Sequence, residues 1–370
     1  AFFMLFFQVL SSYVRALYDT VMASFLMNIV IRVLAASILL LYFFNWIDFQ
    51  QFMYAFVGTY GIIMLGLLAY TFLQFEVDLK PDLGFLRKLL VKNMANYSMF
   101  AFFGGLASII VNNIDIIMLS SLAGLSDTGI YAIAFYVGSA ITIPRKSIYQ
   151  ISSPVISDAF KNKNLSLIKR VYHQSSLNLV IAGGLVFCGV IANIDNLMSL
   201  LPPDYTGGAM VIVVIASANV FDMATGVNGA IILNSKYYRF DLYSTLILIV
   251  TTILLNYLLI PIYGILGAAI GTGSAVVLYN ILKVSYVWLR FSMQPFEWGI
   301  LPVIAIGAGT LLVIFQIPTM VNTYADILIR SAIITALYLI PVVSLKISEQ
   351  FNELVFKSLT NVKNTIRKIF

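Results

Sequence analysis

Long apolar runs separated by short polar connections constrain this chain more than any other feature. They cover residues 1–14, 23–44, 51–74, 94–122, 128–157, 175–194, 207–232, 240–260, 263–289, 298–317 and 325–345. All but the first are long enough, at about 1.5 Å per residue, to cross a hydrocarbon core of about 30 Å as an α-helix. Because a backbone in lipid must satisfy its own hydrogen bonds, we predict an all-α polytopic membrane protein with about 11 transmembrane helices.

Composition supports the same class. Hydrophobic residues make up 61% of the chain and charged residues 10%, whereas soluble domains carry roughly 25% charged residues. The single cysteine, Cys188, can form no disulfide within the chain, and the single histidine, His173, has no partner at metal-ligand spacing. We interpret both residues as structural and expect no bound metal and no other cofactor.

Lysine and arginine occur in every second connection between the apolar runs. These connections and the tail hold Lys80, Arg87, Lys88, Lys92, Lys161, Lys163, Lys169, Arg170, Lys236, Arg239, Lys283, Arg290, Lys346, Lys357, Lys363, Arg367 and Lys368. Short basic loops remain on the cytoplasmic side, so the alternation predicts that these connections and the C-terminus are cytoplasmic. The basic residues of these connections would face the anionic cytoplasmic leaflet, so the net charge of +6 needs no nucleic-acid partner to explain it.

Two segments are predicted to lie on the membrane rather than across it. In residues 346–370 apolar residues recur at helical spacing and lysines occupy the other face, which is typical of an interfacial amphipathic helix. Residues 79–93, with Pro81 and Asp82 suited to a helix start, form either a shorter interfacial linker or a solvated connector.

Ionisable residues inside apolar runs are the candidate functional groups. The chain contains no catalytic signature, and no outward connection is long enough for a catalytic domain, so an enzyme is not expected. Asp115, Arg145 and Lys146 lie deep in their runs, where charged groups mark a pathway or a binding site by default. Arg32 is a further candidate for a cavity wall, whereas Arg330, near the outer end of its run, is expected to extend to the interface.

The stretch ITIPRKSIYQISSPVISDAF combines prolines, cations and hydroxyl groups. Pro144 and Pro154 are predicted to kink the helix, because proline frees a backbone carbonyl, and such kinks are tolerated beside a polar cavity. Arg145 has paired N–H donors that can hold a phosphate. We therefore predict that this helix lines a polar cavity.

A second interpretation, given equal weight for Arg145, is an ion pair with Asp115 that ties two helices together. For Asp115 itself the ion pair is slightly favoured over a position facing the cavity. Asn112, three residues before Asp115, shares its helix face and is expected to help satisfy the carboxylate.

Further polar residues lie in later runs. Those expected mainly to form hydrogen bonds between helices are Asp222, Asn219, Asn228 and Asn256. Asp222 is also, like Asp115, a candidate for binding a coupling cation or proton.

Two stretches resemble landmarks of a known family. IDIIMLSSLAGLSDTGIYAIAFYVGSAITIPRKSIYQISSPVISDAF has an Asp, a short outward loop, a Gly-Ile-Tyr and a proline near the inner end. LLNYLLIPIYGILGAAIGTGSAVVLYNIL has an Asn, a Leu-Ile-Pro, a Gly and a Gly-Ala-Ala. In this order and spacing they resemble the polysaccharide flippases of the MATE-like MOP exporter superfamily.

The resemblance implies a MATE-like bundle of two helical lobes around a central cavity, with an incomplete first lobe. The expected parts are the last three helices of that lobe (1–78), an interfacial linker (79–93), a six-helix second lobe (94–292), two additional helices (293–345) and the cytoplasmic tail (346–370).

The resemblance also implies a function. The family moves undecaprenyl-diphosphate-linked oligosaccharides across the bacterial plasma membrane by alternating access, for O-antigen, capsule or similar polysaccharides. Cations that line the cavity would engage the diphosphate, a role that falls here to Arg145 and Lys146, and less directly to Arg32. Expected partners are the lipid-linked substrate, membrane lipids and other polysaccharide assembly proteins.

Three alternatives stay open. A cation-coupled multidrug exporter of the same superfamily would prefer carboxylates to arginine in its cavity. A membrane oligosaccharide polymerase would show a large outward loop, which this sequence lacks. A non-transporting scaffold would close its buried charges into ion pairs without a cavity.

Overall fold

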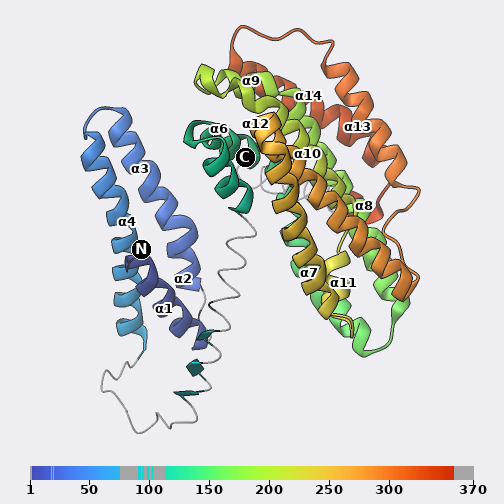
Figure 1. The fold of residues 1–370 in the computed structure, drawn as a ribbon, viewed down its shortest axis with the longest axis horizontal. Coiled ribbons are helices and arrows are strands. Elements are labelled where there is room, and N and C mark those ends of the chain that lie inside the picture. The colour runs from blue at the N-terminus through green and yellow to red at the C-terminus, as the bar shows by residue number, and fades with distance from the viewer. Residues whose placement is uncertain are drawn as a thin grey trace, which may run out of the picture. The chain divides into compact units, whose positions relative to one another are not determined.

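A computed structural model of the chain describes residues 2–17, 19, 21–75, 91–92, 94–95, 98–99, 102 and 113–353. All regular elements within these residues are helical, so the predicted all-α class is confirmed. Most of the predicted linker 79–93, Asn112 and tail residues 354–370 lie outside the described part. The chain divides into two compact units, Ala1–Ser98 and Met99–Phe370 (Figure 1).

The first unit is built from α1 (Phe2–Ala16), α2 (Val21–Phe25), a π-helical turn (Leu26–Val30), α3 (Ile31–Phe43) and α4 (Phe49–Gln74). Asp48 starts α4 with a capping box, in which its carboxylate accepts a hydrogen bond from the Gln51 backbone N–H at 2.7 Å. Phe7, Leu26 and Leu67 form part of a small core between these helices.

The second unit begins, in the described residues, with the helix Asn113–Leu122. It continues with α6 (Leu125–Ser139), α7 (Ile143–Lys161), α8 (Leu165–Ala192), α9 (Ile194–Ser199), α10 (Ala209–Ala224), α11 (Asn228–Leu233), α12 (Arg239–Phe291), α13 (Ile300–Ile314) and α14 (Thr323–Ser344). The helix α8 lies at the centre of this unit, where it packs against α7, α10, α13 and α14 (Figure 1).

Two predicted runs are interrupted where polar residues gather. The run 128–157 is divided by a 3₁₀ turn, Ala140–Thr142, and Pro144 follows at the start of α7, where a proline costs no helical hydrogen bond. Pro154 lies inside α7, which the structure draws as one helix. The run 207–232 is divided between α10 and α11 at Gly226, whose φ of +62° suits glycine.

The helix α12 is a hairpin of two arms. A straight helix of 53 residues would be about 80 Å long, far more than a bilayer is thick. The chain reverses at Gly264, which has φ 55° and ψ −130°, and the rings of Phe240 and Tyr286 stack with their centroids 3.6 Å apart. The two separate runs predicted at 240–260 and 263–289 are therefore confirmed.

Candidate functional site

A groove of about 680 Å³ lies between α7, α10 and α12 of the second unit, and charged and polar side chains share its mainly apolar lining. Its lining residues are Thr142, Arg145, Lys146, Tyr149, Gln150, Asn219, Asp222, Leu248, Val276 and Tyr279. On α7 these residues recur at spacings of three and four, which places them on one face of the helix. The groove thus collects Arg145, Lys146, Asp222 and Asn219 from the predicted site residues.

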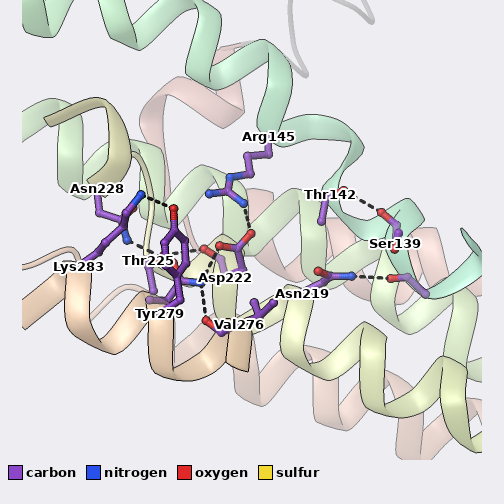
Figure 2. A network of polar contacts seen from close by, with 12 residues as sticks. Ser139, Thr142, Arg145, Asn219, Asp222, Thr225, Asn228, Val276, Tyr279 and Lys283 are labelled. Atoms are coloured by element: carbon purple, nitrogen blue, oxygen red, sulfur yellow. Dashed lines mark hydrogen bonds and ion pairs between the residues drawn. The ribbon is translucent and has the colours of Figure 1, made fainter. Parts of the chain in front are cut away.

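Arg145 forms an ion pair with Asp222 through Nη1 (Figure 2). The side chain of Arg145 is 34% exposed, whereas that of Asp222 is 6% exposed. No other hydrogen bond of the guanidinium is recorded among the described residues, which leaves N–H donors for a ligand in the groove that Arg145 lines.

The predicted ion pair between Arg145 and Asp115 is wrong. Asp115 instead accepts a hydrogen bond from the hydroxyl of Tyr131 at 2.6 Å. The turn between the two helices lies midway between Asp115 and Tyr131, so these residues meet at the same level of the hairpin. Arg145 lies 14 residues beyond Tyr131, a displacement of about 21 Å along a helix axis.

Asp222 belongs to a buried hydrogen-bonding network that joins α10, α11 and α12 (Figure 2). Its Oδ1 accepts from Asn280 Nδ2 at 2.8 Å. Asn280 Oδ1 in turn accepts from Thr225 Oγ1 at 2.9 Å and from Asn228 Nδ2 at 3.3 Å. Asp222 is thereby held in place on one side and meets Arg145 on the other.

Asn219 and Lys146 differ in their surroundings. Asn219 donates to the carbonyl of Gly138 at 3.1 Å and so links α10 to α6. The two helices approach closely at this glycine, because a Cβ added there would lie 3.0 Å from Ile215. This contact is of the kind expected for helix packing. Lys146 is exposed at the groove and belongs to none of the ion pairs recorded among the described residues.

Lys283 was predicted to lie in a basic connection between helices. In the structure it lies within α12, is 4% exposed, and donates to Asp241 Oδ1 at 2.7 Å and to the hydroxyl of Tyr279. Its position inside the apolar run 263–289, four residues after Tyr279, was the sequence feature that could have indicated its burial. Tyr149 and Tyr279, which line the groove, were not predicted as site residues either.

Two polar side chains of α12, those of Thr272 and Asn256, have buried polar atoms. Among the described residues, Thr272 Oγ1 and both amide atoms of Asn256 are buried without a hydrogen-bond partner. Thr272 lies next to the Tyr131 hydroxyl that contacts Asp115, and Asn256 occupies the space left by the missing side chain of Gly271. The prediction that Asn256 forms a hydrogen bond between helices is therefore wrong.

The expectation for Arg330 is also wrong, because this residue is buried. Its Nε donates to Asp326 Oδ2 at 2.7 Å, and Nη2 donates to the carbonyl of Ile317 at 2.7 Å. Asn196 of α9 donates to the same carboxylate oxygen at 2.6 Å. Three partners, Asp326 and the carbonyls of Ile314 and Ile317, hold the guanidinium inside, where it need not reach the interface.

Arg32 lies in α3 of the first unit and is exposed. Its predicted place on a cavity wall stays a prediction. Asn112 lies outside the described residues.

Comparisons with known proteins identify flippases. No protein-family model matches the chain. A probable flippase, AglR of Haloferax volcanii, is 25% identical over 205 residues, which are 53% of this chain and 40% of that protein. A probable low-salt glycan biosynthesis flippase, Agl15 of the same organism, is 21% identical over 215 residues, 56% of this chain and 45% of that protein. The chain thus spans less than half the length of these relatives.

Among solved structures, the lipid II flippase MurJ in an inward closed conformation matches with a TM-score of 0.64. The match covers 97% of this chain and 72% of MurJ at 12% sequence identity, so it shows the fold alone. The predicted fold class, a helical polytopic membrane protein, is confirmed. The resemblance to flippases is confirmed as well, since both curated relatives carry that name.

Proposed function

We propose that this protein moves a lipid-diphosphate-linked oligosaccharide across the membrane by alternating access. The observation that carries the proposal is the groove in which Arg145 and Lys146 present cationic donors beside buried polar side chains. The names of the two relatives, one a probable flippase and one a probable glycan biosynthesis flippase, support the same class of activity.

The ion pair of Arg145 explains how an anionic headgroup can enter and leave. A diphosphate offers the guanidinium the bidentate geometry that arginine recognises well. Asp222 neutralises Arg145 when the groove is empty, and the phosphate takes over part of that role on binding. Lys146 adds the positive charge that draws the anion in, because Asp222 already balances Arg145.

The oligosaccharide would pass through the polar interior while the lipid tail stays in the bilayer. Only binding, reorientation and release are needed, so no bond of the substrate is cleaved and the protein is not an enzyme. We place it in a bacterial plasma membrane with a cytoplasmic C-terminus, beside other polysaccharide assembly proteins. A multidrug exporter is disfavoured, because the groove presents an arginine and a lysine to its ligand.

Asp115 is the better of the two carboxylates for binding a coupling cation. Asp222 is already paired with Arg145, whereas the partners of Asp115 in the described residues are neutral. The hydroxyl of Thr272 lies next to Tyr131, which contacts the Asp115 carboxylate. One carboxylate with neutral oxygen donors suits a monovalent cation or a proton, because it leaves little excess negative charge.

Transport tests the proposed function directly. The purified gene product is reconstituted in vesicles that contain a fluorescent undecaprenyl-diphosphate oligosaccharide, and flipping is measured by the access of an impermeant quencher. Arg145→Ala should lower the rate at least about tenfold, because a charge-assisted bidentate contact contributes roughly 1.5–3 kcal/mol. Arg239→Ala, which removes an exposed arginine outside the groove, is the matched control. A wild-type rate in Arg145→Ala would refute the role of this groove.

The coupling ion has its own test. Flipping by the wild-type protein should accelerate when a sodium or proton gradient is imposed across the vesicle membrane. Asp115→Asn should keep basal flipping and lose the acceleration, because the neutral amide cannot offset a cation. An unchanged response to both gradients in the variant would rule out Asp115 as the coupling residue.

A further inference from the structure

The hydroxyl of Tyr279 has only one direction left in which to donate. The ammonium group of Lys283 has three N–H donors and no acceptor, so in its contact with Tyr279 the tyrosine oxygen must accept. The O–H proton of Tyr279 therefore points away from Lys283. No acceptor for this proton is recorded among the described residues, and Tyr279 lines the groove.

Lys283 is itself held firmly. It is 4% exposed, donates to Asp241 Oδ1 at 2.7 Å, and lies 4.3 Å from the centroid of the Tyr279 ring. Because Asp241 offsets the ammonium charge, the main effect of Lys283 on Tyr279 is orientation. Lys283 fixes which side of the phenol oxygen accepts, and thereby which side donates.

Figure 2 shows Tyr279 between Lys283 and Asp222, with Arg145 reaching towards Asp222 from α7. The groove thus carries a cationic fork on α7 and an oriented neutral donor on α12. A ligand with one phosphate can use only one of these places at a time. A diphosphate has two adjacent anionic groups and can use both.

We propose that Tyr279, positioned by Lys283, forms a second phosphate subsite in the groove and selects lipid diphosphates over lipid monophosphates. This inference rests on the proposed function, because it assumes that the groove receives the diphosphate of the substrate. Tyr279 contacts the ligand, and Lys283 acts through Tyr279 as a positioning residue.

Binding of two short-chain probes, farnesyl diphosphate and farnesyl monophosphate, to the purified protein in detergent tests the proposal. Wild type should bind the diphosphate more tightly. Tyr279→Phe should weaken diphosphate binding about tenfold, roughly the 1.4 kcal/mol of one hydrogen bond to a charged group, and leave monophosphate binding within twofold. Lys283→Met should cause the same selective loss, while Lys283→Arg, which also can only donate, should retain the preference.

The double variant separates positioning from a general effect on folding. Because Lys283 acts through Tyr279, Tyr279→Phe with Lys283→Met should lose no more affinity than either single variant. Tyr257→Phe and Lys169→Met, which alter exposed residues elsewhere, should match wild type. The proposal is overturned if the affinity losses of the two single variants multiply in the double variant. An unchanged diphosphate preference in Tyr279→Phe would overturn it as well.

The two proposals can fail separately. If wild type neither flips the substrate nor binds either probe, the proposed function fails and the subsite fails with it. If wild type flips substrate and prefers the diphosphate while Tyr279→Phe behaves like wild type, only the subsite is wrong.

Discussion

Three ion pairs are recorded among the described residues, and their burial separates their roles. Arg330 and Asp326 are both almost fully buried, with side-chain exposures of 5% and 0%. Arg145 and Asp222 are 34% and 6% exposed, so solvent and ligands reach the arginine but not the carboxylate. A pair that is open on its cationic side can exchange its partner for a phosphate, whereas a pair closed on both sides can only support the fold.

This asymmetry predicts unequal costs for removing the two partners of Arg145–Asp222. Arg145→Gln leaves a buried carboxylate without its cation and should lower the free energy of unfolding by about 3 kcal/mol. Asp222→Asn leaves an arginine that can turn towards the groove, and it should cost only about 1 kcal/mol. Thermal unfolding in detergent compares the two variants. Equal shifts of the melting temperature, or a larger shift for Asp222→Asn, would contradict the asymmetry.

Breaks between helices position the site at the scale of elements. The 3₁₀ turn Ala140–Thr142 precedes the face of α7 that carries Arg145, and the break at Gly226 follows Asp222 by one turn. A Cβ on Gly226 would approach Ser175 Oγ at 3.1 Å and Ser176 Cβ at 3.2 Å, so α8 leaves no room for a side chain there. Reversal of α12 at Gly264 returns its second arm, with Tyr279 and Lys283, to the groove.

Gly264→Ala should therefore weaken the hairpin of α12. Its φ and ψ lie in a region that is nearly exclusive to glycine, and forcing alanine into it costs about 1–3 kcal/mol. Gly309→Ala in α13 is a matched control, because a Cβ meets no atom within 4 Å at either position. In a helix this control should be neutral or stabilising by about 0.5–1 kcal/mol. Equal melting temperatures for the two variants would argue against backbone strain at Gly264.

The whole molecule combines two separately packed units with an alternation of charge along the chain. The first unit has its own core of residues from α1, α2, the π-helical turn and α4, while the second packs around α8. Lysines and arginines of the connections remain exposed at Lys161, Lys163, Lys236 and Arg239. Lys283, which was counted among them, lies inside the second unit, yet the alternation does not depend on it because Arg290 follows in the same connection.

Cysteine labelling tests the topology that this alternation predicts. In a Cys188→Ser background, Ser126→Cys and Thr319→Cys should react with an impermeant maleimide in intact cells. Asn162→Cys and Lys236→Cys should react only after permeabilisation, because basic connections remain cytoplasmic. All four positions are exposed. The wild-type protein, whose natural Cys188 is 2% exposed, is the control and should stay unlabelled. Labelling of Ser126→Cys and Asn162→Cys from the same side would refute the assignment.

The local sequence determined the class of fold and most of its segments. Apolar runs of sufficient length must form helices in lipid whatever they pack against, because the backbone there can satisfy its hydrogen bonds only internally. The two arms of α12 could be predicted as separate helices, because one helix of their combined length would not fit a bilayer. Counting residues on both sides of the short turn puts Asp115 level with Tyr131, so the predicted pairing of Asp115 with Arg145 overlooked information that the sequence contained.

Only the tertiary structure decided which charges meet. Arg145 and Asp222 are 77 residues apart, and their contact depends on how α10 packs against the 3₁₀ turn that precedes α7, a turn that no periodicity reveals. The depth of Lys283 was equally undetermined, because a long lysine at the edge of a run can either extend outward or turn inward to a carboxylate. Spacing along one helix sets the height of a charge in the membrane, whereas its partner is set by the rotation and packing of several helices.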